Sequence, residues 1–240
     1  MGEYEVKAYE EVLEWKRKML KRPKMVQRLS KQVQLKINEK IPDKAHEIIT
    51  DAIKKFVKVT LSGSQLTTKI STVENGTLEQ RDKQLDEKLS IYRKTAVVEG
   101  ASTGAGGFLL GLADFPALLS IKMKFLFDVA NIYGFDTKKV EERIFILQVF
   151  QMAFSSAEKR KEILELIEGW EERKTSLLDL DWKEFQQEYR DHIDFVKMLQ
   201  LMPGIGAVVG AFANYNLLDQ LGETAKNCYR IRHLTNPPMQ

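Results

Sequence analysis

The feature that most constrains the fold of this chain is a pair of glycine-rich apolar segments, over residues 99–134 and 201–234. Within each segment, glycines recur four residues apart in helical register. The glycines of these strips include Gly104, Gly107, Gly111, Gly206 and Gly210. Such spacing gives a helix a flat strip on which another backbone can approach closely. Because glycine costs a helix about 1 kcal/mol relative to alanine, close packing must offset the loss. We therefore expect the two segments to lie in the core, against each other or against a shared neighbour.

The rest of the chain also has the pattern of helices. Apolar residues recur with spacings of three and four, most clearly from Ala45 to Leu61, and alternating runs typical of strands are absent. No proline-rich linker divides the chain. The sequence predicts an all-α fold: a single helical domain over residues 1–240, of about eight or nine helices, with basic N-terminal helices over residues 3–41.

A bilayer-spanning helix is the less favoured interpretation of the first glycine-rich segment. Its most apolar stretch, residues 104–121, is at the short end for a span and contains Asp114 and Pro116. A carboxylate in such a stretch must be paired, protonated or placed at a helix end. We interpret Asp114 as the N-cap of a helix that begins at Phe115, with Pro116 near its first position. Asn214 has the corresponding position in the second segment, where it could cap or hydrogen-bond in the same way.

The first glycine-rich segment closes with Tyr133 and Gly134. Glycine is the usual residue where a helix ends in a left-handed conformation. This pair therefore predicts a helix C-terminus, with Gly134 as the left-handed residue.

Positive charge is concentrated near the N-terminus. Residues 16–36 contain nine lysines and arginines and no acid, although the whole chain has a net charge of only +3. Beside Trp15, Met19 and Leu20, such a run suits an anionic membrane surface, and an equally favoured alternative is a solvated helix face. Nucleic acid is disfavoured, because no aromatic residue follows Trp15 within the run and no nucleic-acid-binding motif is present. The residues predicted to bind anionic lipid are Lys16, Arg17, Lys18, Lys21, Arg22, Lys24 and Arg28.

Motifs for catalysis and cofactor binding are weak. The three histidines have no metal-ligand spacing, and no Gly-Lys-Ser/Thr follows the glycines at 104–107, so we expect no metal and no cofactor. Cys228 and His233 form a weak dyad candidate, but a lone cysteine is more often buried than catalytic. A lone cysteine also fits a reducing compartment, and an acidic start without an apolar run does not look like a signal peptide.

The chain resembles a known family in its glycine-rich motifs. Residues 104–116, 130–136 and 203–214 resemble the EcsC family, and residues 15–23 are similar to its N-terminal region. The resemblance implies a bacterial protein of a family whose function is mostly unassigned, named from an operon that also encodes an ABC transporter. It implies no catalytic residues, because the family has no established set.

These observations favour a non-enzymatic cytoplasmic helical protein that associates peripherally with the inner face of the cell membrane or with a membrane transporter complex. Two alternatives stay open: a peptidase-like hydrolase with an unidentified active site, and a soluble protein-interaction module. The sequence leaves the oligomeric state undetermined.

Overall fold

Every regular element in the part of the chain described by the computed structural model is a helix. The described residues are 2–20, 43–62, 76–103, 107–155, 157–179 and 207–235. They form α1 (Glu3–Leu20), α3 (Asp43–Ser62), α4 (Leu78–Thr103), α5 (Gly107–Ile132), α6 (Val140–Phe154), α7 (Ala157–Glu168), α8 (Trp170–Arg173), the 3-10 helix η2 (Ser176–Asp179) and α11 (Ala207–Thr235). The all-α prediction is confirmed. Residues 21–36, which complete the basic run that begins at Lys16, lie outside the described residues.

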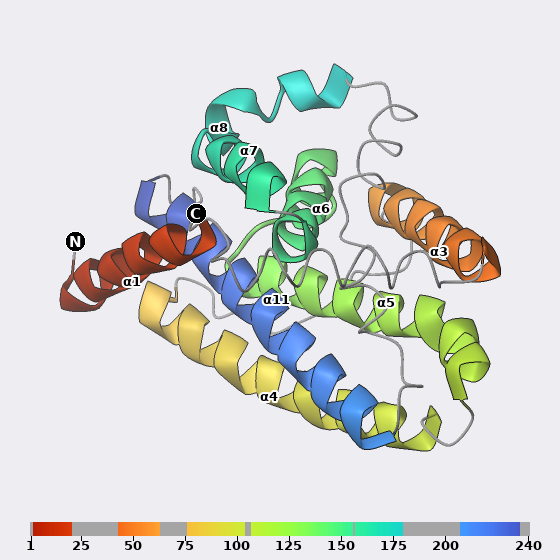
Figure 1. Ribbon diagram of the computed structural model, residues 1–240. Helices are drawn as coiled ribbons and strands as arrows, with labels where there is room; N and C mark the ends of the chain where they lie inside the picture. The colour runs from red at the N-terminus through yellow and green to blue at the C-terminus, as the bar shows by residue number, and fades with distance from the viewer. Residues whose placement is uncertain are drawn as a thin grey trace.

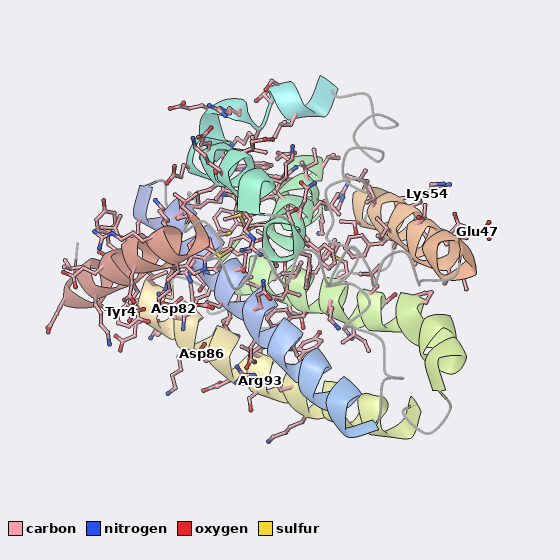
Figure 2. All side chains as sticks on the ribbon, in the orientation of Figure 1. Tyr4, Glu47, Lys54, Asp82, Asp86 and Arg93 are labelled. Carbon is pink, nitrogen blue, oxygen red and sulfur yellow. The ribbon has the colours of Figure 1, made fainter. Side chains whose placement is uncertain are left out.

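Two long helices, α4 and α11, lie side by side and run antiparallel (Figure 1). Three ion pairs cross between them: Asp82 with Arg230, Asp86 with Lys226, and Arg93 with Asp219. From Asp82 to Asp86, α4 advances by four residues, while the partners on α11 go back by four, from Arg230 to Lys226. From Asp86 to Arg93, α4 advances by seven, while the partners go back by seven, from Lys226 to Asp219. Asp82, Asp86 and Arg93 follow one another along α4 (Figure 2). The ion pairs therefore follow one antiparallel register.

Close approach of α4 and α11 depends on Gly222. A Cβ atom built on Gly222 would lie 2.8 Å from Cδ2 of Leu89, a distance that real Cβ atoms do not show. Leu89 is itself buried in the core, so it has little room to move away. The absence of a side chain at Gly222 thus sets the spacing of the two helices between the ion pairs.

The remaining helices pack around this pair. On α4, Tyr92 contacts Phe125 of α5 with ring centroids 5.3 Å apart, and α6 is buried along almost its whole length. Phe56 of α3 meets Phe150 of α6 at 4.8 Å, while α1 and α7 contact α11. One hydrophobic core therefore extends from α1 through α11 and α6 to α3 (Figure 1).

The described parts of the two glycine-rich segments form the end of α4, α5 and α11. Helices α5 and α11 contact each other and share α4 as a neighbour, as predicted. Gly107 is the first residue of α5, Gly111 lies within it, and Gly210 lies in the first turn of α11. Gly104 and Gly206 lie outside the described residues. Among the glycines whose surroundings the structure describes, Gly222 has the shortest Cβ contact, and the sequence analysis did not single it out.

The prediction that a helix begins at Phe115 was wrong. Helix α5 is continuous from Gly107 to Ile132, so Asp114 is an interior residue and Pro116 lies inside the helix. Asn214 likewise lies within α11 rather than at its start. Proline at an interior position lacks the N–H that would bond the carbonyl of Leu112 and destabilises a helix by about 3 kcal/mol. The surrounding packing of α5 must outweigh that cost, which a local capping rule does not include.

No helix in the described ranges combines the length and the apolar character needed to cross a membrane. This holds for α5, the most apolar of them.

Enlarging Gly222 should destabilise the protein. We expect Gly222→Leu to lower the free energy of unfolding by about 1–3 kcal/mol, because a new side chain must displace Leu89. For a chain of this size, that corresponds to a melting temperature lower by about 2–12 °C, measurable by circular dichroism. Gly2→Leu is the control, since nothing lies within 4 Å of a Cβ at Gly2. In a double-mutant cycle, Leu89→Ala should couple to Gly222→Leu by at least about 0.5 kcal/mol; additive effects would contradict the proposed close contact.

Candidate functional site

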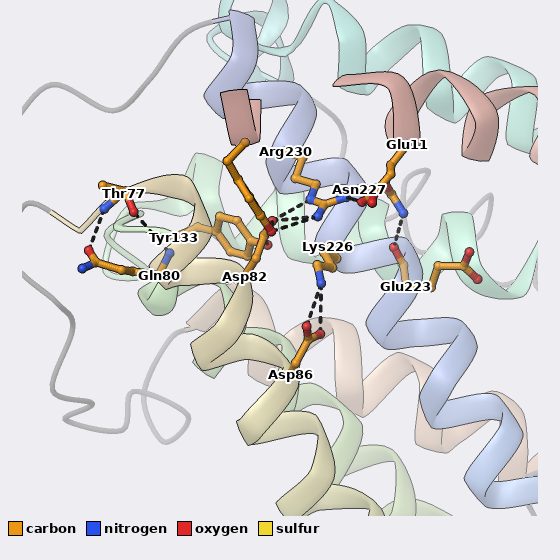
Figure 3. Close-up of polar contacts among 11 residues, drawn as sticks. Glu11, Thr77, Gln80, Asp82, Asp86, Tyr133, Glu223, Lys226, Asn227 and Arg230 are labelled. Atoms are coloured by element: carbon orange, nitrogen blue, oxygen red, sulfur yellow. Dashed lines mark hydrogen bonds and ion pairs between the residues drawn. The ribbon is translucent and has the colours of Figure 1, made fainter. Parts of the chain in front are cut away.

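The densest group of converging polar side chains surrounds Asp82, near the start of α4. This carboxylate is only 1% exposed. Its Oδ2 accepts hydrogen bonds from the Tyr4 hydroxyl and from Nε of Arg230, each at 2.8 Å, and its Oδ1 accepts one from the Tyr133 hydroxyl. Arg230 also pairs with Glu11 at 2.7 Å (Figure 3). The Asp82 cluster, defined here as Tyr4, Glu11, Asp82, Tyr133 and Arg230, therefore ties together α1, α4, the end of α5 and α11.

Burial determines the protonation of the cluster. Desolvation, and after it the Asp82 carboxylate, raises the pKa of Tyr133 well above its ordinary value. Desolvation and the hydrogen bond to Asp82 raise the pKa of Tyr4 to about 12. Burial lowers the pKa of Arg230, but its bonds to Asp82 and Glu11 outweigh burial and raise the net value. At neutral pH, Tyr4 and Tyr133 are therefore protonated and donate hydrogen bonds, and the Arg230 guanidinium is charged.

The end of α5 provides the Tyr133 side of this cluster. Gly134 has a φ of 85°, the Gly134 N–H donates to the carbonyl of Asn131 at 2.9 Å, and the Phe135 N–H donates to the carbonyl of Ala130 at 3.0 Å. These two bonds form a Schellman motif, so the predicted helix end at Tyr133 and Gly134 is confirmed. Arg81 donates to the carbonyl of Ile132 at 2.6 Å and occupies the space that a Gly134 side chain would need.

A second cluster is defined by Arg232, Glu142 and Glu171, and its arginine stands two residues after Arg230 on α11, about half a helical turn away. Arg232 donates to both oxygens of Glu142, at 2.6 and 2.9 Å, and to Glu171 at 2.6 Å. Its guanidinium also lies 3.8 Å from the centre of the Phe135 ring. Burial lowers the pKa of Arg232, but the Glu142 bond raises it further, and the net shift is upward. Stacking and bidentate pairing at one position require arginine rather than lysine.

Neither cluster resembles a reactive centre. The polar atoms of both clusters bond mainly to one another. Cys228, the predicted weak nucleophile, is fully buried, and burial raises the pKa of its thiol, whereas reactive cysteines have a lowered pKa. His233 bonds through Nε2 to the carbonyl of Tyr133 at 2.8 Å; since a carbonyl only accepts, Nε2 carries the proton. In the described ranges, no three histidine, cysteine or acidic side chains are grouped to hold a metal ion.

A surface groove of about 230 Å³ lies between α3 and α5. Its floor consists of the buried side chains Ala52, Phe56, Leu119 and Met123. Lys55, Val59, Thr60, Pro116 and Ser120 complete its walls. The candidate residue Pro116 thus faces an apolar groove, remote in the chain from the basic residues.

The predicted lipid-binding residues are partly described. Arg17 and Lys18 are exposed at the end of α1, where Lys18 pairs with Glu14 of the same helix at 3.0 Å. Lys16 instead pairs with Glu168 of α7 at 2.6 Å. Trp15 is only 4% exposed and belongs to the core, so its expected place in a membrane-facing apolar surface was wrong. Lys21, Arg22, Lys24 and Arg28 lie outside the described residues.

Comparison with known proteins identifies the family. The family model described as "EcsC protein family" matches residues 6–234. The chain belongs to the EcsC family. It is 50% identical over 225 residues to "Protein EcsC" of Bacillus subtilis (strain 168), with 94% of each chain covered. It is 34% identical over 143 residues to "Uncharacterized protein YdbA" of the same organism, covering 58% of this chain and 53% of that one. No solved structure matches the chain.

In this EcsC-family protein, sequence reasoning missed both buried clusters. Asp82, Arg230 and Arg232 belong to no motif, and in the sequence they look like the charges of a solvated helix. One signal was present: Arg230 and Arg232 stand among Cys228, Tyr229 and Ile231, on a stretch of helix that is otherwise apolar or aromatic. Arginine in such a stretch indicates a buried ion pair, because an unpaired buried charge is very costly.

Removing the Asp82 charge should be far more damaging than removing a charge from the exposed pair beside it. Asp82→Asn removes the buried carboxylate partner of Arg230 and leaves it only the half-exposed Glu11, so we expect a loss of about 3–5 kcal/mol in unfolding free energy. Asp86→Asn is the matched control one turn along α4, where the carboxylate is 59% exposed and pairs with Lys226 at 2.9 Å. It should cost about 1 kcal/mol or less. Equal losses in urea denaturation would show that the Asp82 cluster does not carry the stability assigned to it.

The phenols of the Asp82 cluster predict a loss of stability at alkaline pH. Tyr4 has a folded pKa of about 12 against about 10 in a model peptide, so the unfolded chain gives up this proton first. Its contribution is complete below about pH 10 and declines as pH rises toward 12. Denaturation measured at pH 9, 10 and 11 should show a shallower decline for Tyr4→Phe than for the wild type. Tyr9→Phe, on the exposed face of the same helix, should decline like the wild type.

Proposed function

We propose that this EcsC-family protein is a non-enzymatic helical protein that attaches peripherally to anionic membrane through the basic segment, defined as residues 16–36. The observation that carries the proposal is the segment itself, with nine basic residues and no acid. Each lysine or arginine near an anionic surface contributes about 1 kcal/mol of attraction. We place the attachment at the cytoplasmic face, where anionic lipid and a reducing environment for Cys228 coincide.

The described start of the basic segment supports surface attachment. Arg17 and Lys18 belong to this segment, and both are exposed to solvent near the end of α1. The pair of Lys18 with Glu14 joins side chains that are 61% and 66% exposed, and such a pair is worth at most about 1 kcal/mol, so lipid phosphate can replace it. Lys16, held by Glu168, contributes to the packing of α1 on α7 instead.

The buried clusters support a non-enzymatic role. Polar groups of an active site converge on a cleft where substrate can reach them. In the described residues, the strongest convergence is at Asp82 and Arg232, and both lie inside the protein with partners from other helices. These groups hold helices together, which suits a rigid platform for a membrane-binding segment.

Vesicle co-sedimentation tests the proposal. The wild type should bind vesicles containing phosphatidylglycerol but not neutral ones, and binding should fall steeply as salt shortens the Debye length from about 10 Å at 0.1 M to about 3 Å at 1 M. Replacing Arg17, Lys18, Lys21 and Arg22 with glutamine should weaken binding a hundredfold or more. Lys16 is left in place because it pairs with Glu168.

A charge-matched control separates local from overall charge. Replacing the exposed Lys83, Lys94, Lys138 and Lys139 with glutamine also takes the net charge from +3 to −1. This variant should keep most of its binding to anionic vesicles. Equal loss in both variants, or equal binding of the wild type to neutral vesicles, would reject the basic segment as the attachment site.

A further inference from the structure

The groove between α3 and α5 has walls that offer few hydrogen bonds. The Thr60 hydroxyl donates to the carbonyl of Phe56 at 2.8 Å, and the Ser120 hydroxyl donates to the carbonyl of Pro116 at 2.8 Å. Both hydroxyls therefore turn back onto their own helices. A sugar, a nucleotide or an extended peptide would lose hydrogen bonds to water here without replacing them. The remaining surface is aliphatic and aromatic, and Val59 at its edge is 40% exposed.

Among the described residues that line this groove, Lys55 is the one with a charged side chain. Lys58 and Lys124 are exposed on the same two helices, one turn beyond Lys55 and Ser120 respectively. The exposed acid Asp51 on α3 lies 3.8 Å from Lys54, which does not line the groove. The complementary ligand therefore combines an apolar body with a negative end.

The size of the groove limits how much of a ligand it can enclose. Pockets that enclose a whole small molecule have volumes of about 300–1,000 Å³, whereas this groove has about 230 Å³. A groove of this size has room for only part of a longer apolar molecule. An acyl chain fits this description, and each methylene group that it buries contributes about 0.8 kcal/mol.

We propose that the groove between α3 and α5 binds one acyl chain of an anionic lipid, with the ammonium group of Lys55 at the negative end of the ligand. The proposal rests on the proposed attachment to anionic membrane and adds a lipid site between α3 and α5, whereas the described start of the basic segment lies on α1.

Titration calorimetry with dodecanoate tests the site without a bilayer. Below its micelle-forming concentration, dodecanoate should bind saturably at one site. Ser120→Phe places a ring in the groove and should weaken binding at least tenfold. Ala117→Phe adds the same ring at an exposed position of α5 outside the groove and should bind like the wild type. Melting curves verify that each variant is folded; if Ser120→Phe is not, Val59→Trp fills the groove from α3 instead.

A second pair of variants tests the charge. Lys55→Gln should weaken dodecanoate binding by about threefold to fivefold, as expected for one exposed ion pair, and should leave dodecyl maltoside binding unchanged. Lys54→Gln is the matched control, because Lys54 points outward from α3 (Figure 2) and does not line the groove. Equal effects of the two substitutions would overturn the role given to Lys55.

The outcomes separate this inference from the proposed function. The glutamine variant of the basic segment should lose vesicle binding but keep dodecanoate binding. Dodecanoate binding that is absent, or that survives both groove-filling variants, would overturn the lipid site and leave attachment through the basic segment intact. Binding of an acidic amphipathic helical peptide in place of dodecanoate, blocked by Ser120→Phe, would identify a protein-docking groove and also overturn the lipid site.

Discussion

The antiparallel pairing of α4 with α11 is the interaction on which the rest of the structure depends. Its three ion pairs reverse in sign along the helices: α4 provides the acid at Asp82 and Asp86 and the base at Arg93. A parallel arrangement, or a slip of a few residues, would leave Asp82 or Arg230 buried without its partner. Gly222 adds a steric requirement, because a side chain at this position would displace the end of Leu89. The ion pairs and the contact at Gly222 thus favour the same register of α4 and α11. Helices α1, α5 and α6 all pack on this pair of helices.

The buried clusters provide specificity more than net stability. Bringing a carboxylate and a guanidinium out of water costs several kcal/mol for each ion, and even good geometry returns little beyond that. Each cluster, however, draws partners from several helices, with Tyr4, Tyr133 and Arg230 around Asp82, and Glu142 and Glu171 around Arg232. A misplaced helix would leave these groups unsatisfied. The hydrophobic core provides the driving force, and the clusters penalise alternative packings.

Patterns among neighbouring residues predicted helices of this fold well. The features that they did not predict depend on packing between residues far apart in the sequence. Apolar spacing located α3, and Tyr133 with Gly134 marked the end of α5, because periodicity and left-handed glycine depend on neighbouring residues only. The cap assigned to Asp114 failed because tertiary packing keeps α5 helical through Pro116. Trp15 was expected beside lipid because its neighbours are basic, yet its own helix face turns to the core. Asp82 and Arg230 are 148 residues apart, and no motif joins them.

The position of α11 at the end of the described chain has a consequence for biosynthesis. Glu11 bonds to Arg230, 219 residues later, so α1 and α4 leave the ribosome long before the helix that neutralises their buried charges. At about 5–20 residues per second, the gap between synthesis of α4 and of α11 is on the order of 5–30 s. During that interval Asp82 and Tyr4 stay hydrated, since local helices form without requiring the missing partner. Contacts of such large sequence separation are slow to form. The contacts of α11 with α1 and α4 therefore form only after the intervening helices have been synthesised.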